Sequence, residues 1–260
     1  MRNIIVHYHL FKNAGTSVDV LLKRNFGSRW AEYEGTGKKL MPAELGAYLT
    51  ANPQLDALSS HNALLPTPQL PETQIFPILF LRHPIDRIRS VYEFERTQNA
   101  KTEGAKMAKR KNFADYVEWR RGRWFDYSVQ NFQTWRLAQG ARPSMRLGAA
   151  NLWSHALRTI ESLPFVGMVE QFELSIKGFE AMLRPHFSNL TFESVWANVS
   201  RARDSNLDDR LGRIEAELGR DRFAQLVREN DLDMNIHKLV RERLEDYSLA
   251  GGNYFDSKGT

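Results

Sequence analysis

“IIVHYHLFKNAGTSVDVLL”, residues 4–22, joins an apolar run, a short polar loop and a helical pattern without interruption. The apolar run predicts a buried strand over 3–9, and the spacing of the later valines and leucines predicts a helix over 16–24. The loop lies between them, at 10–15. A strand, a tight loop and a helix N-terminus in succession can bind phosphate, because backbone N–H groups and the helix dipole point at the anion.

Further strands and helices alternate along the chain. Apolar runs predict strands in “LDALSSHNALL” (55–65), “TQIFPILFL” (73–81) and “PFVGMVE” (164–170), although Pro77 argues against a regular central position in the second of these. Helices are expected at 42–53, 85–92, 113–122, 126–139, 151–162, 172–187, 207–219, 221–229 and 233–246. This alternation predicts an α/β fold, P-loop-like and three-layered, with a central, mostly parallel sheet and many flanking helices. We expect one domain over 1–250 and a flexible tail over 251–260.

The composition of the 260 residues is that of an ordinary globular protein, with 42% hydrophobic and 26% charged residues. There is no apolar run of membrane-spanning length, and the first residues do not read as a signal peptide. The absence of cysteine excludes thiolate chemistry and fits a reducing compartment, so we expect a cytoplasmic protein. The net charge of +5 fits either an anionic partner or a merely basic surface. No nucleic-acid-binding motif is present, so nucleic acid is not an expected partner.

The phosphate loop differs from the ATP-binding pattern. In G-x-x-x-x-G-K-[ST] the lysine follows the last glycine, and the next hydroxyl holds magnesium. Here Gly15 is followed by Thr16, and Lys12 precedes the glycine by three residues. The strand “IFPILFL” ends in Arg82 rather than in the acidic magnesium partner. The pattern favours a site that binds phosphate directly with cations, although a plain strand-to-helix turn with a capping threonine has the same local sequence.

A second candidate anion site lies in “FLRHPIDRIRSVYEFER”, residues 80–96. Arg82 follows a predicted buried strand, at the sheet edge where open α/β folds bind ligands. Ser90 lies in the helix that begins after Pro84, so it can face back toward Arg82. An arginine fork with a hydroxyl suits a terminal phosphate. A surface arginine and an ordinary helical serine would give the same pattern.

Together the two motifs resemble those of sulfotransferases that use 3′-phosphoadenosine 5′-phosphosulfate (PAPS), above all the heparan-sulfate 2-O-type and similar bacterial members. “HLFKNAGTS” is similar to their 5′-phosphosulfate loop, H-x-P-K-x-G-G-T-S, with Phe11 for the proline and Ala14 for the first glycine. “LRHPIDRIRSVY” is similar to their 3′-phosphate motif, R-D-P-x-x-R-x-x-S-x-Y, with His83 for the aspartate. “NFQTWRLAQG” (131–140) and “FVGMVEQFELSI” (165–176) resemble later family segments more weakly.

The resemblance implies transfer of a sulfuryl group from PAPS to an acceptor hydroxyl, leaving adenosine 3′,5′-bisphosphate (PAP), without a metal. Lys12 would stabilise charge on the bridging oxygen. The residues expected to bind the donor are Lys12, Asn13, Ala14, Gly15, Thr16, Ser17, Arg82 and Ser90. His61 is the expected general base, since similar glycan-type members place a histidine in that strand region; a structural histidine is the alternative. We expect His9 to support the loop.

The acceptor is expected to be a glycan or glycolipid, and a glycolipid would bring the protein to a membrane surface. The resemblance suggests acceptor contacts at Asn131, Gln133 and Arg136. Glu170, after the strand “FVGMV”, is a candidate either for contacting the acceptor or for supporting the site from behind. The basic segments 101–111 and 120–125, with Trp124 and Phe125, could also contact an acidic sugar, or could be a solvated face with core aromatics. Segment 97–112 could close over the site. The alternatives from other classes are a magnesium-dependent P-loop kinase and a non-catalytic nucleotide-binding protein.

Overall fold

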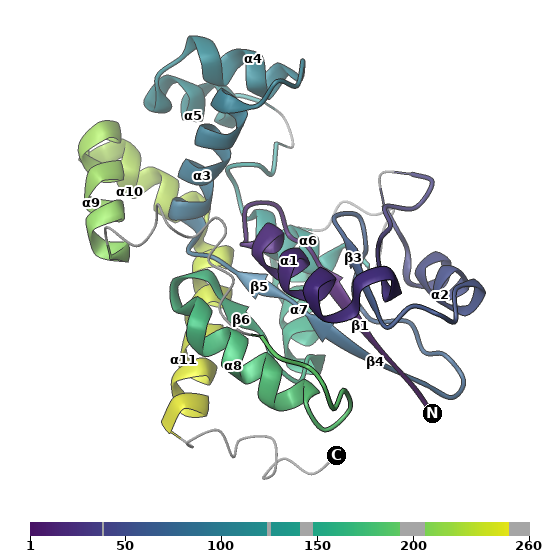
Figure 1. The fold of residues 1–260 in the computed structure, drawn as a ribbon. Coiled ribbons are helices and arrows are strands. Elements are labelled where there is room, and N and C mark those ends of the chain that lie inside the picture. Colours follow the sequence, from purple (N-terminus) through teal and green to yellow (C-terminus); the bar gives the residue numbers. More distant parts are fainter. Residues whose placement is uncertain (38, 124–125, 141–147, 193–205, 250–260) are drawn as a thin grey trace.

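The computed structural model describes residues 1–37, 39–123, 126–140, 148–192 and 206–249. Its centre is a parallel sheet (Figure 1). Four strands have the order β2-β3-β1-β4, and a shorter pair, β5-β6, lies beyond β4. Their bounds are Arg2–Tyr8 for β1, Trp30–Glu32 for β2, Ala57–Ser60 for β3, Thr73–Ile78 for β4, Phe80–Leu81 for β5 and Gly167–Met168 for β6. The prediction of an α/β fold with a parallel sheet is therefore confirmed.

The strands pair in parallel, and helices cover both faces of the sheet, as is usual for parallel sheets. β1 is the central strand: its last five residues are buried, and it pairs with β3 on one side and β4 on the other. Pro77 lies in β4, opposite Val6, at the edge of the four-stranded sheet, where a residue without an N–H is tolerated. The chain breaks the strand at Leu79 and resumes as β5, which pairs with β6.

Helices lie on both sides of the sheet (Figure 1). On one side are α1 and α8, and on the other are α6, α7 and α11, all of which contribute buried side chains to one large core. Their bounds are Gly15–Phe26 for α1, Phe172–Leu183 for α8, Phe132–Ala138 for α6, Ala149–Ser162 for α7 and Asp231–Leu249 for α11. Helix α2, Pro42–Ala51, contributes Leu45 and Leu49 to the same core, and short 3-10 turns occupy Gly27–Arg29 and Val169–Gln171.

A second hydrophobic cluster lies beyond the end of the sheet (Figure 1). Its buried residues come mainly from helices, namely α3 (Pro84–Thr97), α4 (Glu103–Arg110), α5 (Phe113–Arg121), α9 (Leu207–Leu218) and α10 (Arg220–Glu229). Helix α3 leaves the sheet at Pro84 and carries Ile85, Ile88 and Tyr92 into this cluster. We call it the helical cluster. Among the described residues no helix is long and apolar enough to cross a membrane.

Most predicted helices are confirmed to within a few residues, but the strands expected over 55–65 and 164–170 are shorter in the structure, and one helix begins later. The helix expected over 126–139 begins only at Phe132, because Asn131 adopts a left-handed backbone (φ 46°) and its side chain donates to the Glu229 carbonyl, 3.0 Å away. Strand β2 was not predicted. The expected tail, 251–260, lies outside the described residues.

Candidate active site

The phosphate loop runs between β1 and α1 and has an unusual backbone. Lys12 and Ala14 both have positive φ angles, 66° and 61°, a conformation that non-glycine residues rarely adopt. Asn13 between them is buried, and its amide donates to the Phe80 carbonyl (2.8 Å) and to Gln133 Oε1 (2.7 Å). These contacts fasten the loop to the end of β5 and to α6. Strain of this kind is retained where the surrounding structure holds it, and it is common at ligand sites.

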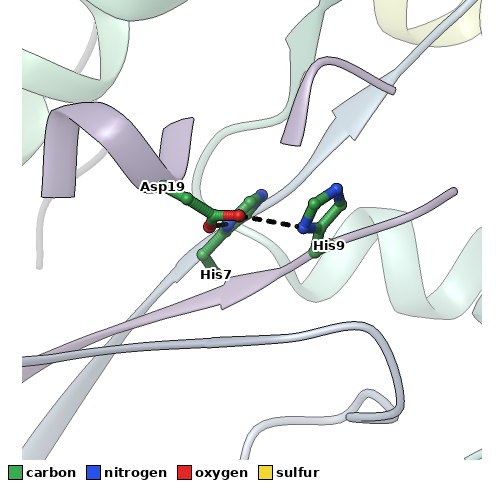
Figure 2. Close-up of side chains that lie close together, drawn as sticks. All are labelled: His7, His9 and Asp19. Carbon is green, nitrogen blue, oxygen red and sulfur yellow. Dashed lines mark hydrogen bonds and ion pairs between the residues drawn. The ribbon is translucent and has the colours of Figure 1, made fainter. Parts of the chain in front are cut away.

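His7, His9 and Asp19 form a compact group beneath the loop (Figure 2). Both histidines come from the end of β1, and Asp19 faces them from the second turn of α1. His7 Nδ1 lies 2.8 Å from Asp19 Oδ1, and His9 Nδ1 lies 3.1 Å from Asp19 Oδ2. Burial would raise the pKa of Asp19, but the hydrogen bonds from the two imidazoles reverse this and hold that pKa far below its usual range.

His9 also explains why position 15 is a glycine. A Cβ built at Gly15 would lie 1.9 Å from His9 Cδ2 and Nε2. No side chain fits there unless the imidazole moves. The structure therefore packs His9 directly against the loop, in agreement with its expected supporting position.

His61 directly follows β3, and its ring packs against His9 with centroids 3.7 Å apart and planes at 34°. Glu34 holds this turn: its carboxylate accepts the backbone N–H groups of His61 and Asn62, each at 2.9 Å. His61 is exposed at the surface, but partial desolvation of its ring and, next, the neighbouring His9 lower its pKa, while Glu34 opposes the shift. The imidazole is thus favoured in its neutral form, the form that can accept a proton.

Arg82 links the two predicted anion motifs. It lies just after β5, and its Nη1 donates to the Lys12 carbonyl at 3.2 Å. Its Nε is paired with Asp86 Oδ2 at 2.8 Å, and Asp86 is also paired with Arg210 from α9 at 3.0 Å. Burial would raise the pKa of Asp86, but Arg82 and Arg210 lower it below its usual value. Ser90, two turns further along α3, is half-buried.

Lys12 lies over an aromatic ring. Its Nζ is 4.5 Å from the centroid of Phe94, which also meets Phe11 edge-on at 5.4 Å. Phe94 is on α3, one turn after Ser90, and is 38% exposed. Burial and the nearby Arg82 lower the pKa of Lys12. The contact leaves the ammonium at the surface of the loop, within the same region as Arg82.

The predicted acceptor residues of α6 are largely used inside the protein. Gln133 is buried, accepts the Arg82 N–H at 2.9 Å and donates to the Arg82 carbonyl at 2.8 Å. Asn131 is bonded to the junction of α10 and α11. Arg136 donates to the His61 carbonyl at 2.7 Å, and burial lowers its pKa to about 10. Arg136 is therefore the one of the three that lies beside the expected base, and acceptor contact stays a prediction for all of them.

Glu170 is in the turn after β6 and lies away from His61. Its Oε1 accepts the backbone N–H of His83 at 2.5 Å, and its Oε2 lies 3.4 Å from His237 Nε2. Burial would raise the pKa of Glu170, but His237 and the His83 N–H bring it below its usual value. These contacts orient the peptide after Arg82, so Glu170 supports the second motif.

Two groups among the described residues have the donor types of a metal site: His7 with His9 and Asp19, and Glu32 with Glu34 and His61. In the first group each imidazole Nδ1 already has an Asp19 oxygen within hydrogen-bonding distance. Hydrogen bonds between the imidazoles and the carboxylate therefore explain why these three side chains lie together. In the second group Glu34 is occupied by backbone N–H groups. The absence of a metal requirement stays a prediction.

Segment 97–112 contains α4, which begins after the capping residue Thr102. Its exposed side chains include Lys106 and Lys109, and Lys109 donates to the Gln98 carbonyl at 2.7 Å. The helix packs on α3 as part of the helical cluster. Much of the segment is therefore helical. Trp124 and Phe125 lie outside the described residues.

No family model matches the chain. Over 251 residues it is 36% identical to an uncharacterized protein of Archaeoglobus fulgidus, and the match covers 92% of this chain and 96% of the archaeal protein. The chain belongs to the family of this archaeal protein. Since identity of this extent implies a common fold, we expect the sheet and the helical cluster in the archaeal relative as well.

Three contributors to the site were not identified from sequence: Asp19, Glu34 and Arg210. Asp19 stands within the stretch quoted first, ten residues after His9, and a search for carboxylates near the loop would have found it. Glu34 follows a strand too short to recognise. Arg210 is more than a hundred residues from Asp86 in sequence, and no local pattern marks it.

Proposed function

We propose that this protein is a PAPS-dependent sulfotransferase that transfers a sulfuryl group to an acceptor hydroxyl. The observation that carries the proposal is the bond from Arg82 to the Lys12 carbonyl, which joins a phosphate loop to a second cationic site at the end of a neighbouring strand. A donor with phosphates at both its 5′ and 3′ positions needs two such sites close together. The resemblance of both motifs to those of sulfotransferases supports the same conclusion.

The residues around the loop suit an anionic donor. Lys12 and Arg82 supply two charges, and the first N–H groups of α1 are directed at the space above the loop. In the free protein Lys12 lies over a phenyl ring and Arg82 is paired with Asp86, and a bound anion would share both cations with these partners. Arg210, which is paired with the same Asp86 carboxylate as Arg82, adds a third cation to this group.

The reaction would be an in-line displacement. The acceptor oxygen forms a bond to sulfur, the bond from sulfur to the bridging oxygen of the 5′-phosphate breaks, and PAP leaves. His61 takes the proton of the acceptor hydroxyl, for which its lowered pKa is suitable because the imidazole is neutral at pH 7. Lys12 stabilises the charge that develops on the bridging oxygen.

The acceptor in this proposal is a carbohydrate or glycoconjugate, and the compartment is the cytoplasm. A kinase or a non-catalytic nucleotide-binding protein would also use the phosphate loop. The kinase needs a carboxylate free to hold magnesium beside the loop, whereas Asp19 and Asp86 are paired with two histidines and two arginines, respectively. This observation favours the sulfotransferase.

Thermal unfolding tests the proposal. The protein is heated with PAP in the presence of a chelator and, separately, with ATP and magnesium. A ligand at a hundredfold its dissociation constant adds about 2.7 kcal/mol of stability, which raises the midpoint by roughly 5–10 °C. A shift with PAP and none with ATP supports the sulfotransferase, and transfer of labelled sulfate from PAPS to a glycan mixture then separates an enzyme from a binder. A shift with ATP and magnesium alone would instead support the kinase.

A further inference from the structure

Asp19 has no part in the proposed reaction, yet both of its carboxylate oxygens are paired with histidines of the site. It lies on α1, half-buried, and each of its oxygens faces an imidazole Nδ1 (Figure 2). A neutral imidazole that donates from Nδ1 carries its lone pair on Nε2. Asp19 therefore selects one tautomer for His7 and for His9 and fixes the rotation of both rings.

The effect of Asp19 extends beyond these two residues through His9. The His9 ring packs against His61 on one side and against Gly15 on another. A rotation of His9 would break its bond to Asp19 and remove the surface on which His61 rests. Asp19, His9 and His61 thus form a continuous contact from helix α1 to the end of β3.

Other neighbours leave the His61 imidazole without a hydrogen bond. Glu34 binds the backbone of the turn, and Arg136 binds the His61 carbonyl. Glu32 and Glu34 lie near enough to influence its charge, and Asp19 does so from behind His9. Among the described residues, no side chain is hydrogen-bonded to the His61 ring, so packing against His9 determines its orientation.

We propose that Asp19 is a positioning residue for the base: through His9 it holds the His61 imidazole toward the acceptor hydroxyl. This inference rests on the proposed function for the identity of the base, although the geometry that it requires can be tested without any activity. Proton transfer depends on a hydrogen-bonding distance to the reacting hydroxyl, so a small rotation of His61 lowers the rate without altering the donor site.

The tautomers provide a test in the wild-type protein. In the full ¹⁵N-labelled chain at pH 8, two-bond proton–nitrogen correlations distinguish Nδ1–H from Nε2–H imidazoles. We expect His7 and His9 to be Nδ1–H tautomers and the ring protons of His61 to be shifted upfield by the His9 ring. Nε2–H tautomers at His9, or unshifted His61 protons, would overturn the inference whether or not the protein is a sulfotransferase.

Variants test the consequence for the reaction. Asp19→Asn should lower kcat at least about tenfold, leave KM for PAPS and the dissociation constant of PAP within about threefold, and remove the upfield shift at His61. Asp56→Asn is the matched control, because Asp56 precedes β3 at the opposite edge of the sheet and pairs with Arg29. It should change none of these quantities. Loss of PAP binding in Asp19→Asn would mean that Asp19 serves the phosphate loop instead of the base.

A double-mutant cycle separates action through His9 from direct action. In a His9→Ala background, Asp19→Asn should lower kcat by less than about twofold, because the contact that it controls is already gone. An undiminished tenfold loss in that background would contradict the inference. If the wild type neither binds PAP nor transfers a sulfuryl group, the proposed function is wrong. The tautomer measurement would still test whether Asp19 orients His9 and whether His9 packs against His61.

Discussion

Gly15→Ala is expected to destabilise the protein because of His9, and its effect should reverse when His9 is removed. The new Cβ would lie 1.9 Å from two ring atoms, so the imidazole must retreat by about 1.5 Å to reach an ordinary contact. Such a movement breaks the 3.1 Å bond to Asp19. Overpacking of this kind costs about 1–3 kcal/mol and loss of the hydrogen bond about 1 kcal/mol, so we expect a total of roughly 2–4 kcal/mol.

The backbone at position 15 does not itself require glycine, since Gly15 is absent from the glycines with positive φ. It is the first residue of α1, where alanine is the better helix former by up to about 1 kcal/mol. In a His9→Ala background, Gly15→Ala should therefore be neutral or stabilising. The coupling between the two positions should be at least about 2 kcal/mol.

Urea unfolding of the wild type, both single variants and the double variant measures this coupling. Gly212→Ala is the matched control: Gly212 lies within α9, and apart from the adjacent helix backbone nothing lies within 4 Å of the position that an alanine Cβ would take, so the substitution should stabilise by about 0.5–1 kcal/mol. Equal costs of Gly15→Ala with and without the imidazole would refute the explanation that His9 excludes a side chain at this position.

Three further predictions concern the loop and the second motif. Asp86→Asn should destabilise by about 3 kcal/mol at pH 7, because it leaves Arg82 and Arg210 without their buried partner. Since folding lowers the pKa of Asp86, its contribution is complete above about pH 4 and declines as the pH falls through the folded-state pKa, so urea titrations should show a smaller difference at about pH 3 than at pH 7. Phe94→Leu should tighten PAP binding about two- to fivefold by calorimetry, because Lys12 no longer leaves a cation–π contact of about 0.5–1 kcal/mol; weaker binding would contradict this. Asn13→Ala should cost about 2–3 kcal/mol in urea and weaken PAP binding, as its buried amide makes two bonds, and full stability would show that the loop holds its shape without them.

The central strands and the loop between β1 and α1 were predictable because their signals are local. β1 and the helix after it follow from one continuous pattern of apolar residues, and Pro84, the first residue of α3, marks the start of that helix. The late start of α6 was not predictable. The backbone conformation of Asn131 is stabilised by hydrogen bonds to residues about a hundred positions away in the sequence.

The site was predictable only in part, for the same physical reason. Lys12, Arg82 and His61 stand in recognisable local motifs, whereas the stacking of His61 on His9 depends on how β1 and β3 pair. Arg210 reaches Asp86 because α9 packs on α3 in the helical cluster. Contacts between side chains that depend on tertiary packing produce no recognisable pattern in the sequence, so these pairs could not be predicted from it.

The separation of the helical cluster from the sheet core has a consequence for local opening. The phosphate loop belongs to the larger core, whereas Arg210 belongs to α9 and is tied to the sheet side through Asp86. Amide hydrogens of α9 can then exchange with solvent through a partial unfolding that leaves β1 protected. An anion bound by both Arg82 and Arg210 would link the helical cluster to the sheet core. Slower hydrogen exchange of the α9 amides would then report that the site is occupied, although α9 lies outside the sheet.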